Sequence, residues 1–397
     1  MKSLYLFLFA LTTIAVVESI IDPATTLQNG NDGFTAKMFS EVVKNNKEKS
    51  IVLSAFSALI PLAQIVLAAV GPSHNELLKS IGFHDDNTTK AVSILINDKV
   101  SSIKGIELKM VNRLYVCSNY QIREDFDEIS RNIFHSEIVK TNFADEENAA
   151  KNINAWVKDQ TNHCIENVVE PSYFNSDTRA VLVNALYFKG TWKYPFDKED
   201  TLNKDFYVNK QKTIQVPMMN TESPFKYRQS RNLKSKLLSL PYDGEETSLL
   251  IILPNDIEGI GDLIKMLKNP YILDDEMYAM YKTDVDVSIP KFKIETTIDL
   301  KDVLKKMNVT KIFGENANLS RLLKSNETLY ISNAIQKAFI EVNEYGVEAA
   351  ATNGIVTLAL RSNMEPLEPI RFIADHPFVF FLRADDLILF SGVFYGS

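Results

Sequence analysis

Histidine is the side chain best suited to acid–base chemistry near neutral pH, and this chain of 397 residues has five. They are scattered along the sequence, at His74, His84, His135, His163 and His376. No Gly-x-Ser-x-Gly motif supplies a serine nucleophile for them to activate. His376 stands between Asp375 and Pro377, a setting typical of a turn. The residues therefore predict no catalytic centre, and we interpret the chain as a protein that is not an enzyme.

Metal and cofactor sites have recognisable spacings, and the chain has neither a His-Glu-x-x-His nor a Cys-x-x-Cys motif. Gly259-Ile-Gly261 lacks the third glycine of a dinucleotide-binding loop and follows Pro254, which indicates a plain turn. We expect no metal and no cofactor. The two cysteines, Cys117 and Cys164, could pair or remain free thiols, and the sequence leaves both alternatives open.

The segment of most unusual composition lies near the C-terminus. Residues 341–352 lead from a β-like run into a glycine and three consecutive alanines, and 354–362 add a β-branched run that ends in Arg361-Ser362. Small side chains need little room, so such a segment can stand exposed as a loop and also fit between two strands. A loop that inserts into a sheet must meet both conditions.

The elements that must position this loop are helices, mostly early in the chain, and strands that cluster late. Apolar residues at helical spacing predict helices over 34–45 and 149–161, and a nearly continuous apolar run predicts a buried helix over 59–70. Strand patterns occur over 109–117, 179–188, 247–253, 284–292, 378–382 and 388–394, with 383–386 as a turn. This order predicts an α+β fold rather than a regular βαβ alternation.

Composition is that of an ordinary folded protein, with 45% apolar and 24% charged residues. No linker, repeat or low-complexity tract divides the chain, so we expect one large domain. The net charge is −8 and no block of basic residues occurs, which argues against a nucleic-acid partner.

The first residues have the pattern of a secretion signal. Lys2 precedes an apolar run over 4–17 that is too short to span a membrane comfortably. We therefore predict a signal peptide over 1–19, a domain over 20–397, an extracellular location and no membrane partner. Four acceptor triplets for N-glycosylation fit a secreted glycoprotein, at Asn87, Asn308, Asn318 and Asn326.

Several motifs, in the same order along the chain, resemble those of the serpins, the serine-protease-inhibitor superfamily. The longest is Val183-Asn-Ala-Leu-Tyr-Phe-Lys-Gly-Thr-Trp192. Shorter ones follow it, at Pro195-Phe196, Asp205-Phe206, Val216-Pro-Met-Met219, Leu240-Pro-Tyr-Asp-Gly244, Ile289-Pro-Lys-Phe292, Ala317-Asn-Leu-Ser320 and Phe372-Ile-Ala-Asp-His-Pro-Phe378. Each short motif is weak alone, but together they extend the resemblance from about residue 30 to the end of the chain.

The resemblance implies a single α+β domain with three β-sheets, eight or nine helices and an exposed reactive-centre loop over about 344–370. In the family, a serine protease cleaves this loop and is trapped as an acyl-enzyme while the loop inserts into the central sheet. The implied function is a secreted, monomeric suicide inhibitor whose partner is a trypsin-like or chymotrypsin-like serine protease, held in a covalent complex. The alternative is a non-inhibitory serpin that acts as a carrier or storage protein.

The hinge at which loop insertion begins in the family maps onto Glu344, Gly346, Val347, Glu348 and the small residues Ala349, Ala350, Ala351 and Thr352. If the inserting strand starts at Val347, strand alternation turns alternate side chains toward the core, at Val347, Ala349, Ala351, Asn353, Ile355 and Thr357. Two of these positions depart from the family, which favours Thr or Ser at the first and an inward Thr at the fourth. A buried amide at Asn353 needs hydrogen-bond partners or costs ~1–3 kcal/mol.

The bond that a protease would cleave has two candidates. Family spacing counted from Glu344 points to Leu360–Arg361 and a chymotrypsin-like target. The side chains favour Arg361–Ser362, because trypsin-like pockets carry a buried carboxylate that binds a cation. We take Arg361–Ser362 as the first candidate and keep Leu360–Arg361 as the alternative.

Four polar residues correspond to the region beneath the opening sheet of the family: Ser54, Ser57, Asn184 and Gln336. Gln336 replaces a family histidine, so this position can bridge polar groups but cannot titrate. The two serines could equally well cap the helix that follows them. Residues 83–90 offer no basic helix face, so we expect little heparin dependence.

Overall fold

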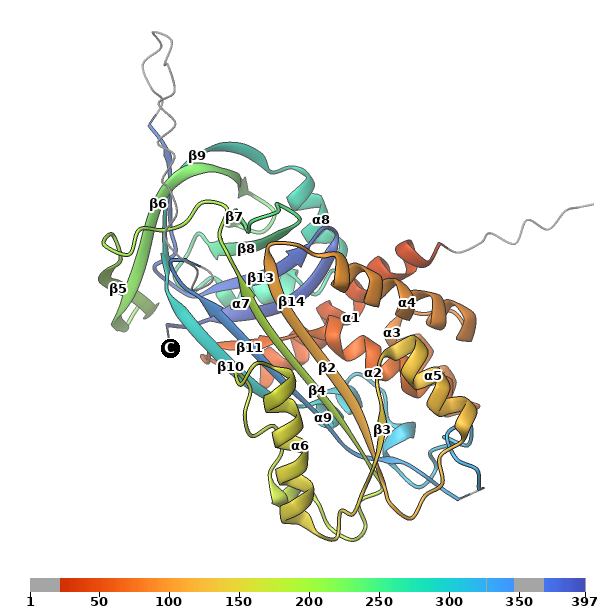
Figure 1. Ribbon diagram of the computed structural model, residues 1–397. Helices are drawn as coiled ribbons and strands as arrows, with labels where there is room; N and C mark the ends of the chain where they lie inside the picture. Colours follow the sequence, from red (N-terminus) through yellow and green to blue (C-terminus); the bar gives the residue numbers. More distant parts are fainter. Residues whose placement is uncertain (1–21, 326, 346–367, 397) are drawn as a thin grey trace, which may run out of the picture.

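The computed structural model describes residues 22–325, 327–345 and 368–396 (Figure 1). Within these ranges the α-helices are α1 (Pro23–Asn45), α2 (Ala55–Ala68), α3 (Pro72–Ile81), α4 (Asp86–Ser102), α5 (Glu124–Phe134), α6 (Glu146–Gln160), α7 (Ile260–Met266), α8 (Tyr271–Tyr278) and α9 (Leu300–Lys306). The predicted signal peptide lies outside the described residues. No helix in the described part of the chain is long and apolar enough to cross a membrane.

All three predicted helices begin earlier than the apolar pattern indicated, α6 at Glu146. α1 starts at Pro23, where the carboxylate of Asp22 accepts hydrogen bonds from two backbone N–H groups of the first turn. Its first half was missed because its buried face carries polar and small residues such as Asn31. The side-chain amide of Asn31 donates to the carbonyl of Ile388 and accepts from the N–H of the same residue. α2 starts at Ala55 because the hydroxyl of Ser54 caps it.

A five-stranded sheet runs through the middle of the molecule (Figure 1). Its order is β10 (Phe292–Asp299), β11 (Ile331–Val342), β4 (Ala180–Gly190), β2 (Ile106–Cys117) and β3 (Ile138–Thr141). Side chains alternate between its faces: Arg113 of β2 lies 4.0 Å from the Trp156 ring of α6, while Asn112 turns to the opposite side. Both faces are therefore covered, which explains why β4 is buried along almost its whole length.

The other nine strands form one continuous sheet. Its path is β1 (Ile51–Leu53), β14 (Leu387–Phe394), β13 (Phe378–Ala384), β8 (Thr247–Pro254), β7 (Ser235–Pro241), β6 (Lys212–Ser230), β9 (Tyr281–Pro290) and β12 (Ile370–Ile373), with β5 (Leu202–Asn209) paired to β6. The two smaller sheets implied by the resemblance are joined here because the 19-residue β6 pairs with β5 at its start, with β9 along its middle and with β7 at its end.

The predicted strand positions hold, with shifts at their ends. The strand predicted over 284–292 ends at Pro290, and Phe292 already opens β10. The turn predicted over 383–386 is shorter, because Arg383 and Ala384 remain in β13. Asp385 has a φ of 49°, so the tight hairpin turn needs only the two residues between the strands.

The buried helix α2 connects the layers. Every residue of α2 is buried, and the helix contacts β2 and β4 of the five-stranded sheet as well as β14 of the other sheet. An apolar surface on all sides is what a helix in this position requires, which accounts for its nearly continuous apolar sequence. The N-terminus of α2 consequently points at the boundary between the two sheets, where the candidate site lies.

Candidate functional site

The central pairing of the five-stranded sheet is a parallel ladder between β4 and β11. It extends from Ile331 opposite Ala180 to Ile340 opposite Phe188, with a register irregularity between Ile331 and Asn333. β11 is also the strand from which the chain enters the small-residue segment, after Val342. We call this ladder the seam. A parallel ladder is slightly less stable per residue than an antiparallel one.

All four polar residues predicted beneath the sheet meet at this seam. Asn184 of β4 and Gln336 of β11 are register partners, and the Gln336 amide donates to Asn184 Oδ1 at 2.6 Å. The hydroxyl of Ser57 donates to the same oxygen at 2.9 Å. Gln336 also accepts from the backbone N–H of Ser54 at 3.0 Å and donates to the Ser54 carbonyl at 2.7 Å. These side chains are fully buried, so the cluster ties the start of α2 to both strands of the seam.

Ser54 both caps α2 and belongs to the polar cluster at the seam. Its hydroxyl accepts from Ser57 N at 2.9 Å, which caps α2, and donates to the Leu389 carbonyl of β14 at 2.6 Å. The cluster thereby reaches the nine-stranded sheet. It also has a fifth member that the sequence did not reveal, because Asn184 Nδ2 donates to Oδ1 of Asn112, its register partner on β2. Amides from three adjacent strands thus form one row across the sheet.

Beyond the last pair of the seam the backbone is held by Glu344, the first residue of the predicted hinge. Its side chain is buried and pairs with Lys291 Nζ at 2.9 Å, while its carbonyl accepts from Phe196 N at 3.1 Å. Burial alone would raise the pKa of this carboxyl, but the hydrogen bond and charge of Lys291 outweigh it and hold the pKa of Glu344 below its ordinary value. Glu344 is therefore anchored as a carboxylate.

An aromatic contact lies beside this anchor. The indole N–H of Trp192 donates to the Asn343 carbonyl at 2.7 Å, and its ring stacks on Tyr242 with centroids 4.2 Å apart. Trp192 ended the longest sequence motif, but nothing in the sequence paired it with residue 343. The remaining hinge residues from Gly346 to Thr352, and both candidate cleavage sites at Leu360, Arg361 and Ser362, lie outside the described residues.

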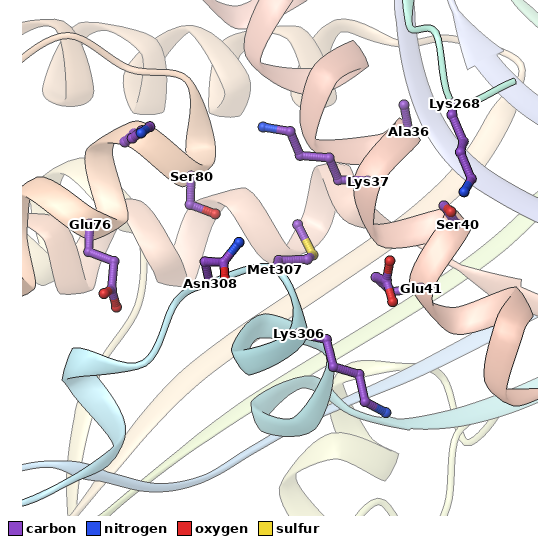
Figure 2. Close-up of a pocket in the computed structure, with 11 residues that line it drawn as sticks. Ala36, Lys37, Ser40, Glu41, Glu76, Ser80, Lys268, Lys306, Met307 and Asn308 are labelled. Carbon is purple, nitrogen blue, oxygen red and sulfur yellow. The ribbon is translucent and has the colours of Figure 1, made fainter.

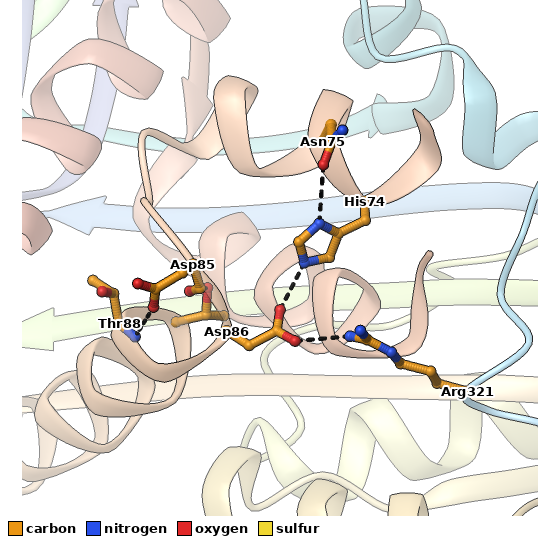
Figure 3. Close-up of polar contacts among 7 residues, drawn as sticks. His74, Asn75, Asp85, Asp86, Thr88 and Arg321 are labelled. Carbon is orange, nitrogen blue, oxygen red and sulfur yellow. Dashed lines mark hydrogen bonds and ion pairs between the residues drawn. The ribbon is translucent and has the colours of Figure 1, made fainter. Parts of the chain in front are cut away.

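The histidines occupy separate structural positions. His376 is buried, with its ring nitrogens 2.7 Å from Asp375 and 2.8 Å from the Pro254 carbonyl. His74 lies 2.6 Å from Asp86, which is also paired with Arg321 at 2.7 Å (Figure 3). This group connects α3, the start of α4 and the segment before β11. No group of His, Cys, Asp or Glu in the described ranges could hold a metal ion.

The predicted glycosylation acceptors Asn87, Asn308 and Asn318 are exposed, and Asn326 is outside the described residues. Cys117 is buried in β2 and Cys164 is partly buried, and the two thiols are not bonded to each other. Of the two alternatives that the sequence left open for the cysteines, the structure has the free thiols.

Comparison with known proteins agrees with this architecture. The family model for serpins, described as serine protease inhibitors, matches residues 29–396, and the chain therefore belongs to the serpin family. It is 49% identical to antichymotrypsin-2 of Bombyx mori over 95% of this chain and 100% of that protein. It is 48% identical to antitrypsin of the same species over 98% of both chains.

A solved structure extends the comparison to the fold. Serpin48 of Tenebrio molitor, described as a highly specific serpin, superposes with a TM-score of 0.84 at 36% identity, covering 94% of this chain and 98% of that one. The predicted α+β serpin fold is confirmed. The similarity to insect antitrypsin and antichymotrypsin places the chain among protease inhibitors.

Proposed function

We propose that this protein is a serine-protease inhibitor that acts as a suicide substrate. The observation that carries the proposal is the direct parallel pairing of β4 and β11. A segment that continues from β11 and folds back on it runs antiparallel to β11. Since β4 is parallel to β11, the same segment is antiparallel to both strands, and it can form ladders on each side once the seam opens.

The small-residue segment suits this place. About 15 inserted residues at ~3.3 Å each would span ~50 Å, and each new ladder hydrogen bond contributes roughly 0.5–1.5 kcal/mol. The stable product is then the sheet with the loop inserted. A protease attached to the loop as an acyl-enzyme would be carried along the sheet, and distortion of its catalytic site would prevent its release.

For the bond attacked, we propose Arg361–Ser362, with Leu360–Arg361 as the alternative. An arginine before the cleaved bond selects a trypsin-like protease, and a leucine there selects a chymotrypsin-like one. The two silkworm relatives are named for one target each, at nearly equal identity, and do not decide between the two bonds. Mass spectrometry of the C-terminal peptide released by trypsin and by chymotrypsin distinguishes the two bonds, because their peptides differ by one arginine.

We further infer that the protein is secreted as a monomer after removal of residues 1–19. The apolar run at the start of the chain and the exposed acceptors Asn87, Asn308 and Asn318 support this. Residues 83–90 contain a single lysine, Lys90, among acidic and polar neighbours, which supports inhibition that heparin accelerates little. Amino-terminal sequencing of protein from insect-cell medium tests the cleavage site.

The test of inhibition is formation of a protease complex that survives SDS electrophoresis. The wild type should form such a complex with a trypsin-like or chymotrypsin-like enzyme. Val347→Arg places a charge at the first inward position, so insertion should fail and the protein should be cleaved as a substrate. Glu348→Arg, at an outward position, is the matched control and should still form the complex. Absence of any complex across a protease panel would favour a non-inhibitory carrier or storage protein.

A further inference from the structure

A cleft of about 600 Å³ lies among α1, α3, α9 and the turn after α7 (Figure 2). Four lysines from these four segments line it: Lys37, Lys79, Lys268 and Lys306. Its volume falls in the range of pockets that hold small molecules. Apart from Ala36 and Met307, the residues that line the cleft are polar or charged.

Three of these lysines lack a charge partner. Lys306 pairs with Asp302 at 2.6 Å and points away from the cleft (Figure 2). The side chains of Lys37, Lys79 and Lys268 make no hydrogen bond or ion pair with any residue in the described ranges. All three are exposed, and Figure 2 shows Lys37 extending from α1 toward the side of the cleft on which Ser80 lies.

The two glutamates of the cleft are already engaged. Glu76 accepts hydrogen bonds from the backbone N–H groups of Thr310 and Lys311, the latter at 2.7 Å. Glu41 pairs with Lys44 on its own helix. Neither carboxylate is paired with the three free lysines, so the cleft concentrates positive charge in a protein whose net charge is −8.

One uncharged donor also lacks a partner. The hydroxyl of Ser80 lines the cleft, is buried, and has no hydrogen-bond partner among the described residues. A buried hydroxyl usually has a hydrogen-bond partner, so the Ser80 hydroxyl is free to donate to a group bound in the cleft. An ammonium group on a flexible stem and a hydroxyl are common donors to phosphate and sulfate oxygens.

We propose that this cleft binds a compact anion with several phosphate or sulfate groups, held by Lys37, Lys79, Lys268 and the hydroxyl of Ser80. Asn308, a predicted glycosylation acceptor, is exposed at the same cleft. A glycan on Asn308 would cover part of the opening. The binding experiment therefore uses the full domain produced in bacteria, without N-linked glycans.

Isothermal titration calorimetry at low ionic strength tests the site with two probes, inositol hexakisphosphate and sucrose octasulfate. The wild type should bind at least one probe at one site, with affinity that falls as salt rises. Lys37→Gln, Lys79→Gln and Lys268→Gln should each weaken binding about tenfold. This is the loss in affinity expected when one of the weaker hydrogen bonds to a charged group is removed. The triple variant should show no measurable binding.

Lys151→Gln is the matched control, because Lys151 is equally exposed and unpaired but lies on α6. It should bind as the wild type does, and unliganded melting curves should be the same for all variants. Stronger binding of the phosphate probe assigns a phosphorylated ligand, and stronger binding of the sulfate probe assigns a sulfated sugar. If neither probe binds the wild type, or if the triple variant binds as tightly as the wild type, the proposal is wrong.

Discussion

Among single residues, Glu344 is the side chain that fixes the chain where it leaves β11. Its carboxylate is buried against Lys291, whose side chain is 41% exposed, so the pair is worth less than a fully buried one. Glu344→Gln should lower the free energy of unfolding by about 1–3 kcal/mol at neutral pH, since it leaves the ammonium without its partner. Urea unfolding of wild type and variant measures the difference.

The pH dependence of this effect has a defined sign. The folded pKa of Glu344 lies below its ordinary value of 4.5, so its stabilising contribution is complete above that value and is lost as the pH falls through the folded pKa. The difference between the wild type and Glu344→Gln should therefore shrink in acid. Glu124→Gln is the control, because Glu124 pairs with Lys324 at the surface and should change stability little. A difference that persists unchanged in acid contradicts the carboxylate role.

Asp32 in α1 presents the opposite case. Burial, together with the charge of Asp274, raises its pKa to about 7, and one of its carboxyl oxygens has no partner in the described part of the chain. A raised carboxyl pKa weakens the fold as pH rises from the ordinary value through the folded one. Asp32→Asn should thus stabilise the protein by roughly 2 kcal/mol near pH 8 and have little effect near pH 4. Thermal unfolding of wild type and variant at the two pH values measures the difference in stability. An equal stabilisation by Asp32→Asn at both pH values would contradict the raised pKa.

The sequence was most informative for residues that stand in a motif. Ser54, Ser57, Asn184 and Gln336 were predicted to lie together, and they do so in one hydrogen-bonded cluster. Asn112 was not predicted, because a polar residue in an alternating strand indicates a solvent-facing position. It is partly buried and contacts Asn184 on the face that α2 covers, which strand periodicity cannot show.

Among the elements, periodicity placed three helices and six strands, but their ends depended on contacts distant in sequence. Periodicity did not predict the long β6, because Pro217 and Pro224 interrupt its pattern. Only the resemblance of residues 216–219 to a family motif pointed to it. These prolines are tolerated within a strand whose pairing changes along its length, from β5 to β9 and then to β7. Sheet continuity was therefore visible only in the folded structure.

The seam offers a prediction about an added strand. A synthetic peptide of residues 347–360 should occupy the place between β4 and β11, since it can pair antiparallel with both. Protein incubated with it should melt at a higher temperature and should be cleaved by its target protease without forming a covalent complex. Both effects are read by thermal unfolding and SDS electrophoresis.

The control peptide carries Ala351→Arg, which turns a charge toward the core if the alternation is as predicted. It should neither raise the melting temperature nor abolish the complex. A second control, Ala350→Arg, changes an outward position and should act as the unmodified peptide does. Equal effects of the two arginine peptides would contradict the assigned faces.

At the scale of the whole molecule, the described structure has the five-stranded sheet closed, with no strand between β4 and β11. Cleavage of the loop by a protease that is not inhibited should release its end and allow insertion. If about 14 residues then form ladder bonds at roughly 0.5–1.5 kcal/mol each, the gain is on the order of 10 kcal/mol. The cleaved protein should unfold at a much higher temperature or denaturant concentration than the intact one.

This measurement tests loop insertion, a step that the proposed inhibition requires. Differential scanning calorimetry of intact and cleaved protein needs no target protease, so it tests insertion independently of specificity. Equal stability of the two forms would mean that the loop does not insert, and the protein would then be a carrier or storage protein. Cleavage at a surface bond outside residues 346–367 is the control and should not raise stability.

The position of the row of amides within the seam has a kinetic consequence. Under the proposed mechanism, an inserting loop would enter at the Ile340 end and separate the strands one pair at a time, so it would reach Gln336 and Asn184 only after four pairs had parted. The amide contacts must then break before the remaining pairs can open. Meanwhile water hydrolyses the ester that joins the protease to the loop. The time spent at this row thus sets the fraction of encounters that end in capture rather than in escape of an active protease.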